Sequence, residues 1–310
     1  MRIVFLGTGA GGGVPQWNCN CTYCMRARQR NGRVRPRREA AIAVSTDGAR
    51  WVILDAPMEL GAMLRMHPYF IPDTTRGTRI HAVVLLHGDV NHAVGVLTFR
   101  GPISDVRTYV SVYSTARVQQ TLLDRCALFR IVKAHWEILP LQQWIPITGP
   151  DGTPTEMEIR AIPVPGKPPT YHWEDHTENT VAIHVRDPRT GTTLTYAPIV
   201  REITPDLLDA FRQSRCIILD GTFWYDHELM DIDPQGGRSA YAIGHIPVQD
   251  SLPVLQEISA PYRIYTHINN TNPLNDPASE AYHTVRAAGI YVAVDGMEID
   301  LAAARVHIPE

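Results

Sequence analysis

The 310-residue chain has almost no lysine, no long apolar run and little net charge. Lys133 and Lys167 are its only lysines, so arginine carries nearly all of the positive charge. The formal net charge of -3 gives no electrostatic basis for binding nucleic acid or an anionic membrane. No apolar run approaches the roughly 18 residues of a membrane span, and the first six residues are too short for a signal peptide. We therefore expect a cytoplasmic protein with neither nucleic acid nor membrane as a partner.

Cysteine is also scarce, and its five copies are unevenly placed. Cys19, Cys21 and Cys24 crowd together, whereas Cys126 and Cys216 are isolated. An odd number of cysteines in a chain of this length without a signal peptide does not indicate a disulfide framework. Cys216 precedes an apolar stretch, so we expect it to be a buried, small apolar residue.

The spacing C-x-C-x-x-C of Cys19, Cys21 and Cys24 predicts a zinc site. Three thiolates this close in a cytosolic chain are best explained by tetrahedral zinc, with a fourth ligand from elsewhere in the chain. The alternative is a set of free or redox-active cysteines. Because the cluster implies no open coordination position, we expect a structural zinc that holds a loop at about 14–38.

A glycine-rich stretch follows the first predicted strand, 2–6. Its G-x-G-x-x-G pattern begins at Gly7 and is also found in dinucleotide-binding folds. Proline and the cysteine cluster follow where the required helix should begin, and the expected acidic residue falls in the basic segment 26–38. The glycines are therefore expected to let the backbone pass close to a site.

Short apolar runs predict strands, and longer patterned segments predict helices. The expected strands are 2–6, 41–44, 51–54, 82–86, 108–112, 157–164, 181–185, 193–196, 216–219, 262–266, 290–294 and 297–301. The expected helices are 58–67, 94–99, 114–129, 205–214, 248–258 and 277–288. No linker or internal repeat interrupts this order, so we expect one α/β domain over 1–310.

The hexapeptide His87-Gly88-Asp89-Val90-Asn91-His92 comes directly after the apolar run 82–86. Imidazole and carboxylate groups on alternate residues can converge on zinc, iron or manganese. The alternative is a polar turn that caps a helix starting near His92. A second strand, 262–266, leads into His267 and a run of polar side chains, so we expect His267 to join the same metal site.

His245, in the tripeptide Ile243-Gly244-His245, is a candidate for acid–base catalysis, because histidine titrates near neutral pH. The alternative is a histidine in a surface loop.

The hexapeptide resembles an altered form of the H-x-H-x-D-H motif of the metallo-β-lactamase superfamily. The resemblance covers nearly the whole chain, and it is closer to the family of the pyrroloquinoline quinone biosynthesis protein B. The segments that carry it are 11–21, 35–37, 164–167, 220–222, 244–246 and 267–273. It implies an αββα four-layer sandwich with the metal at one edge of its two sheets. It also implies a structural zinc at the cysteine cluster, where Asn270 stands in the place of a zinc-binding histidine of some relatives and the fourth ligand stays open.

Differences from the superfamily pattern argue against a site with two metal ions. Asp89 replaces the second motif histidine. The segments 163–166 and 196–198 lack the further histidine and the bridging carboxylate of a dinuclear hydrolase. One half-site is therefore largely missing, which disfavours two-metal hydrolysis. The other half-site keeps His92 and His267.

Two histidines and a carboxylate suit non-haem iron(II) and dioxygen. Relatives usually carry aspartate at the position of Asn91, so we expect Asp89 to supply the negative charge, with Asn91 offering a neutral oxygen. His87 is then a further ligand or a base, and His245 moves protons. The resemblance implies a mononuclear iron oxygenase that hydroxylates the phenol ring of a tyrosine-derived amino acid or small peptide, in the biosynthesis of pyrroloquinoline quinone or a related compound.

Two other functions stay open. One is a metal-dependent hydrolase of a phosphodiester or an ester. The other is a non-catalytic carrier or binding protein with a degraded metal site, for which Asn91 is the main support. A homodimer is compatible with the sequence.

Overall fold

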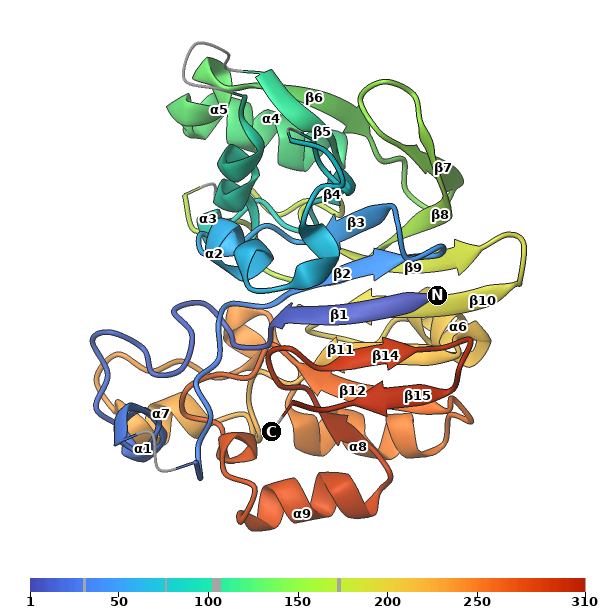
Figure 1. Cartoon of the computed structure of the whole chain (residues 1–310). Coiled ribbons are helices and arrows are strands. Elements are labelled where there is room, and N and C mark those ends of the chain that lie inside the picture. The colour runs from blue at the N-terminus through green and yellow to red at the C-terminus, as the bar shows by residue number, and fades with distance from the viewer. Residues whose placement is uncertain (30–31, 76, 102–106, 172–173, 310) are drawn as a thin grey trace.

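The computed structural model describes residues 1–29, 32–75, 77–101, 107–171 and 174–309, and within them two mixed β-sheets pack face to face (Figure 1). The first sheet has the order β15 (Arg305–His307), β14 (Glu298–Asp300), β1 (Arg2–Gly7), β2 (Ala41–Ser45), β3 (Trp51–Leu54), β4 (Ile80–Val84), β5 (Arg107–Ser114) and β6 (Lys133–Ile138). The second has the order β13 (Tyr291–Val292), β12 (Tyr262–Thr266), β11 (Cys216–Asp220), β10 (Thr192–Ala197), β9 (Val181–Asp187), β8 (Pro154–Pro163) and β7 (Trp144–Thr148).

Helices cover the outer face of each sheet (Figure 1). The α-helices are α1 (Thr22–Gln29), α2 (Leu60–Arg65), α3 (Val90–Ala93), α4 (Ala116–Arg125), α5 (Ala127–Ile131), α6 (Pro205–Gln213), α7 (Glu228–Ile232), α8 (Val248–Gln256) and α9 (Glu280–Ala287). The 3-10 helices are η1 (Pro68–Phe70), η2 (Val94–Phe99), η3 (Tyr241–Ile243) and η4 (Pro273–Asn275). None of the helices within the described ranges is both long and apolar enough to cross a membrane.

The strand β11 shows how sequence alternation builds the layers. Cys216 and Ile218 lie in the core between the two sheets, whereas Ile217 and Leu219 lie in the core beneath α6, α8 and α9. Successive side chains of a strand point to opposite faces, so a strand buried on both faces reads as a continuous apolar run. The expected αββα sandwich is confirmed, as is the burial of Cys216.

Parallel pairing brings the carboxyl ends of key strands to one edge of the sandwich. In the first sheet β3, β4, β5 and β6 are parallel neighbours, and in the second sheet β10, β11, β12 and β13 are. Consequently, residues after β4, β11 and β12 line a common cavity, and Asp55, directly after β3, contacts His92 of that lining. The candidate site forms at this edge, where the carboxyl ends of the parallel strands of both sheets meet.

Several expected element boundaries need correction. The expected helix 114–129 is two helices, α4 and α5, which are separated at Cys126. The N-cap of α4 is Thr115, whose side chain accepts a hydrogen bond from the Val118 N–H, so the first helix begins two residues later than expected. Residues 22–29 of the expected cysteine loop form α1, and residues 30 and 31 of that loop lie outside the described residues.

The sequence reading also missed β6 and β7. Both are edge strands, β6 beside β5 in the first sheet and β7 beside β8 in the second. The side chains of β6 are exposed or half-buried, so the strand lacks an apolar run, and Pro146 interrupts β7. Proline is tolerated in an edge strand because the missing N–H would face solvent.

One buried histidine outside the candidate site predicts a pH dependence of stability. The Nδ1 atom of His184 lies 2.7 Å from the Thr195 hydroxyl, and burial, with smaller contributions from Arg160 and Arg186, lowers its pKa from 6.5 to about 4. Between these two pH values the unfolded chain binds the proton more readily than the folded protein does. The free energy of unfolding therefore falls as the pH drops from about 6.5 toward about 4.

We expect His184→Leu to make this fall shallower, because the variant has no imidazole to protonate at that position. The measurement is urea unfolding at several pH values between 4 and 7. His135→Leu is the matched control, since the His135 side chain is half-exposed. Equal slopes for His184→Leu and the wild type would contradict the prediction.

Candidate metal centre

Four histidines from three segments of the chain meet in a cavity of about 420 Å³ at the sheet edge. His87 and His92 follow β4, His245 follows η3, and His267 directly follows β12. Asp89 and Asn91 also line this cavity, so the structure brings together every residue that the sequence predicted for the active site. The glycines Gly11 and Gly12 line it too, which confirms that the glycine-rich segment passes close to a site.

Two residues of the site have an unusual backbone conformation. Asp55, directly after β3, has a φ of 66°, and His267 has a φ of 58°. Residues other than glycine rarely adopt this left-handed region, and its cost is accepted mainly where the surrounding structure and function require it. The strained conformations fix the direction in which the two side chains leave their strands.

His92 is oriented by the buried carboxylate of Asp55. The Nδ1 atom of His92 lies 3.2 Å from the Asp55 Oδ2 atom, and both side chains are almost fully buried. Burial alone would lower the pKa of His92, but the Asp55 carboxylate outweighs it and raises that pKa. A histidine whose Nδ1–H is held by a carboxylate has Nε2 left to bind a metal.

His267 is held in the same way by the hydroxyl of Thr222. This hydroxyl donates its one proton to the Asp220 carboxylate at 2.6 Å, so at 2.7 Å it accepts a hydrogen bond from the Nδ1–H of His267. The lone pair of neutral His267 is therefore on Nε2, which is buried and has no hydrogen-bond partner among the described residues. Burial, followed by the nearby His245 and His92, lowers the pKa of His267 well below 6.5. An unpartnered imidazole nitrogen is the expected state of a metal ligand without its metal.

His245 forms a hydrogen-bonded pair with Asp220. The two atoms, His245 Nδ1 and Asp220 Oδ2, are 2.7 Å apart, and both residues are buried. The rings of His245 and His267 stack with centroids 5.4 Å apart, and those of His267 and His92 stack at 5.5 Å. One ligand atom each from Asp220, His245 and His267 lie within 4.8 Å of one another. The Asp220 oxygens already accept hydrogen bonds from the Val200 N–H and from Thr222, so this carboxylate orients His245.

His87 and Asp89 use their polar atoms within the protein. The His87 Nε2 atom lies 2.9 Å from the carbonyl oxygen of Lys167, and burial lowers the pKa of His87 to about 4. Asp89 Oδ1 accepts hydrogen bonds from the Thr170 N–H and hydroxyl at 2.7 and 2.6 Å, and Asp89 Oδ2 lies 3.8 Å from Lys167 Nζ. Burial would raise the pKa of Asp89, but His87 and these neighbours lower it. The roles of His87 and Asp89 as ligands stay predictions.

Asn91 lies against the glycine-rich segment. A Cβ atom added to Gly11 would be 3.1 Å from the Asn91 Nδ2 atom, so a larger residue there would push this amide by a few tenths of an ångström. The ligand role of Asn91 also stays a prediction.

Sequence reasoning missed the residues that orient the histidines, namely Asp55, Asp220 and Thr222. Asp55 and Asp220 were visible as polar groups at strand ends. In the parallel pair of β11 and β12, Asp220 is the register partner of Thr266, next to His267. The strand order, which the sequence did not reveal, brings these strand ends next to one another.

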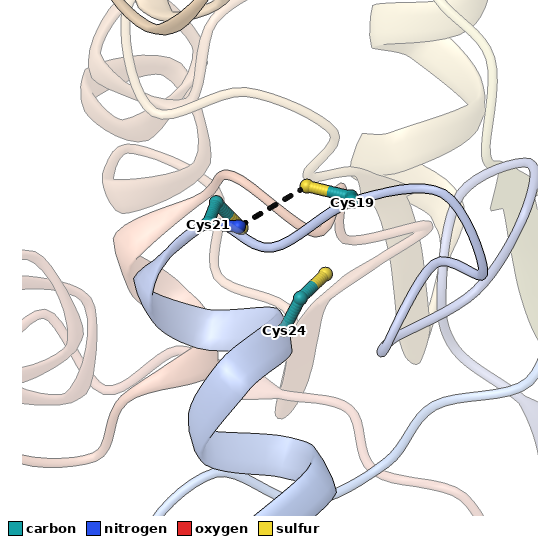
Figure 2. Close-up of side chains that lie close together, drawn as sticks. All are labelled: Cys19, Cys21 and Cys24. Atoms are coloured by element: carbon teal, nitrogen blue, oxygen red, sulfur yellow. Dashed lines mark hydrogen bonds between the residues drawn. The ribbon is translucent and has the colours of Figure 1, made fainter.

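Cys19, Cys21 and Cys24 form the second candidate metal site (Figure 2). Cys19 and Cys21 precede α1, and Cys24 lies on it, so the three sulfur atoms come within 4.8 Å of one another. Burial raises the pKa of Cys24 to about 11. Burial would also raise the pKa of Cys21, but hydrogen bonds from the neighbouring cysteines outweigh it and lower that pKa. The three thiols fit zinc, which would displace their protons on binding.

Asn270 closes this cluster from the loop after β12. Its Nδ2 atom lies 3.1, 3.7 and 3.4 Å from the sulfur atoms of Cys19, Cys21 and Cys24. An amide nitrogen is a donor and does not bind zinc, so Asn270 would have to turn its Oδ1 atom toward the sulfurs to act as the fourth ligand. The fourth ligand therefore stays open.

The chain is similar to known proteins over nearly its whole length. Residues 50–268 match the family model described as the beta-lactamase superfamily domain. The coenzyme PQQ synthesis protein B of Nitrosococcus oceani is 34% identical over 318 residues, covering 97% of this chain and 100% of that protein. The protein of the same name from Methylococcus capsulatus is also 34% identical, with the same coverage. The chain belongs to the coenzyme PQQ synthesis protein B family, within the beta-lactamase superfamily.

Solved structures agree with this family. The Zn(2+)-bound PqqB from Methylobacterium extorquens has a TM-score of 0.86 and 31% identity, covering 97% of this chain and 100% of that one. A diphosphatase of the PhnP family has a TM-score of 0.66 at 19% identity, covering 96% of this chain and 97% of that one, so it supports the fold alone. The resemblance seen in the motifs is confirmed as a family relationship.

We expect Cys24→Ser to lower the zinc content of purified protein by about one equivalent and to destabilise the fold, because the serine hydroxyl is a much poorer zinc ligand than a thiolate. Elemental analysis and thermal unfolding measure the two effects. Cys126→Ser is the control, since Cys126 lies outside the cluster. Unchanged zinc content in Cys24→Ser would show that the three thiols are not a zinc site.

Proposed function

We propose that this chain is a mononuclear, iron-dependent oxygenase. Its substrate is a tyrosine-derived amino acid or small peptide, whose phenol ring it hydroxylates during the biosynthesis of pyrroloquinoline quinone or a related compound. The observation that carries the proposal is the pair of buried imidazoles, His92 and His267, each fixed through Nδ1 and each with Nε2 left for a metal. The family name of the relatives supports the pathway.

The donor set fits one metal ion. His92 and His267 would hold it, with Asp89 or Asn91 as candidates for the oxygen ligand because both line the same cavity. Iron(II) held by histidine and oxygen ligands with open positions would supply the activation of dioxygen. The segments 163–166 and 196–198 add neither histidine nor carboxylate, which favours one metal over two.

His245 is the residue placed to move a proton. The Asp220 carboxylate accepts a hydrogen bond from its Nδ1–H at 2.7 Å, so Nε2 is the ring atom left to accept or release a proton. The Phe223 ring packs against His245 with a centroid separation of 5.8 Å. Buried neighbours of this kind restrict water around the imidazole, which strengthens its hydrogen bond to Asp220.

The walls of the cavity suit an aromatic ring with a polar end. Ile199, Phe223 and Ile243 supply apolar surface, and Lys167 supplies a positive charge. A volume of about 420 Å³ lies in the usual range of small-molecule sites. Lys167 Nζ, 3.8 Å from Asp89 Oδ2, is the cation available to pair with an acidic group of the substrate.

Oxygen uptake tests the proposal. Protein purified without oxygen and loaded with iron(II) should consume dioxygen in the presence of a tyrosine-containing peptide, and His92→Ala and His267→Ala should abolish uptake by removing iron ligands. His227→Ala, at an exposed histidine, is the matched control. Absence of uptake with every phenolic peptide although iron is bound would refute the oxygenase. Two metal equivalents beyond the cysteine cluster would favour a hydrolase, and function that survives both alanine variants would favour a carrier.

His245→Gln should lower the turnover number by about 100-fold with iron content unchanged, because general acid–base residues commonly contribute about 10² to 10⁴ in rate. Asp220→Asn should reduce turnover in the same direction by weakening the hold on His245 Nδ1. An unchanged turnover number in His245→Gln would exclude His245 from proton transfer.

A further inference from the structure

A second cavity, of about 760 Å³, lies beside the metal cavity. The two share a border, because Gly166 lines the second cavity and the next residue, Lys167, lines the metal cavity. His87 and Thr180, which line the metal cavity and the second cavity respectively, pair through their backbones. The second cavity therefore adjoins the metal cavity.

The second cavity has an apolar side and charged groups of both signs. Pro163, Val164 and Pro165 give the apolar lining. Arg201 gives one positive charge, and among the described residues its guanidinium has no hydrogen bond or ion pair, since only its backbone N–H is engaged, by Pro165. Asp175 and Asp206 give negative charges at exposed positions, and the Asp206 carboxylate already accepts a hydrogen bond from Gln142 Nε2. A cation and a carboxylate on one cavity match a ligand that carries both charges.

Two oxygen atoms of the lining have no partner although they are buried. Asn179 and Thr180 are 3% and 2% exposed. Neither Asn179 Oδ1 nor Thr180 Oγ1 has a hydrogen-bond partner among the described residues. Thr180 lies close to Gly166, where an added Cβ atom would come within 2.6 Å of Thr180 Oγ1. Buried polar atoms are normally satisfied, and a threonine hydroxyl reaches a new partner by rotation about one bond. The wall of this cavity is thus incompletely hydrogen-bonded without a ligand.

We propose that this second cavity binds a small zwitterion, namely an amino acid or the two ends of a short peptide. The carboxylate of the ligand pairs with Arg201, the ammonium group pairs with Asp175, and the apolar part packs on the proline-rich side. The Thr180 hydroxyl turns by rotation about one bond to hydrogen-bond a polar atom between these ends. The site acts independently of the metal and of turnover, so it stands or falls separately from the proposed oxygenase.

The test is isothermal titration of the full-length protein, as purified, with the dipeptide Ala-Phe, its N-acetyl derivative and its C-terminal amide. We expect the dipeptide to bind, and each derivative to bind at least about 5-fold more weakly because one charge is lost. Arg201→Gln should weaken binding of the dipeptide about 10-fold but should not weaken binding of the amide further. Asp175→Asn should weaken the dipeptide but not the N-acetyl derivative.

Two control variants show whether the dipeptide binds at this cavity or elsewhere on the protein. Arg212→Gln removes an exposed arginine of α6 that lies outside the cavity lining, and it should bind the dipeptide as the wild type does. His92→Ala alters the metal cavity and should also leave dipeptide binding unchanged. The proposal is overturned by absence of binding at millimolar dipeptide, by equal affinity in Arg201→Gln and the wild type, or by loss of binding in His92→Ala.

Discussion

The structure depends on hydrogen bonds to the Nδ1 atoms of three buried histidines. Asp55 holds His92, Asp220 holds His245, and Thr222 holds His267 while donating to Asp220. Each bond decides which ring nitrogen carries the proton and turns the other nitrogen toward the cavity. Without these partners, burial would leave the imidazoles unoriented and the metal site undefined.

The sandwich fold places these three histidines and their hydrogen-bond partners at one edge of the two sheets. Parallel strands in each sheet deliver Asp55, Asp220 and His267 at their carboxyl ends, and Asp55 and His267 accept strained backbone conformations there. The inter-sheet core and the helices on both outer faces hold the strands that carry this strain. The same edge carries the zinc-binding candidate, since Asn270, three residues after His267, contacts all three thiols.

The sequence predicted the apolar strands and the residues that gather in the cavity, because both follow from local patterns. The strand β12 was expected at its observed bounds, and His92 and His267 were expected to share one site. It did not predict β6, whose half-exposed side chains lack an apolar run. The sequence also could not show that Thr170, 81 residues from Asp89, donates hydrogen bonds to the Asp89 carboxylate, because such a contact depends on the tertiary fold.

The central claim is that one metal ion binds between His92 and His267. The most direct measurement is anomalous scattering at the iron and zinc absorption edges from crystals of protein loaded with iron(II). We expect a single iron peak within bonding distance of the Nε2 atoms of both histidines, and a zinc peak at Cys19, Cys21 and Cys24. An iron peak bound instead by Asp220 and His245, or two metal peaks in the cavity, would contradict it.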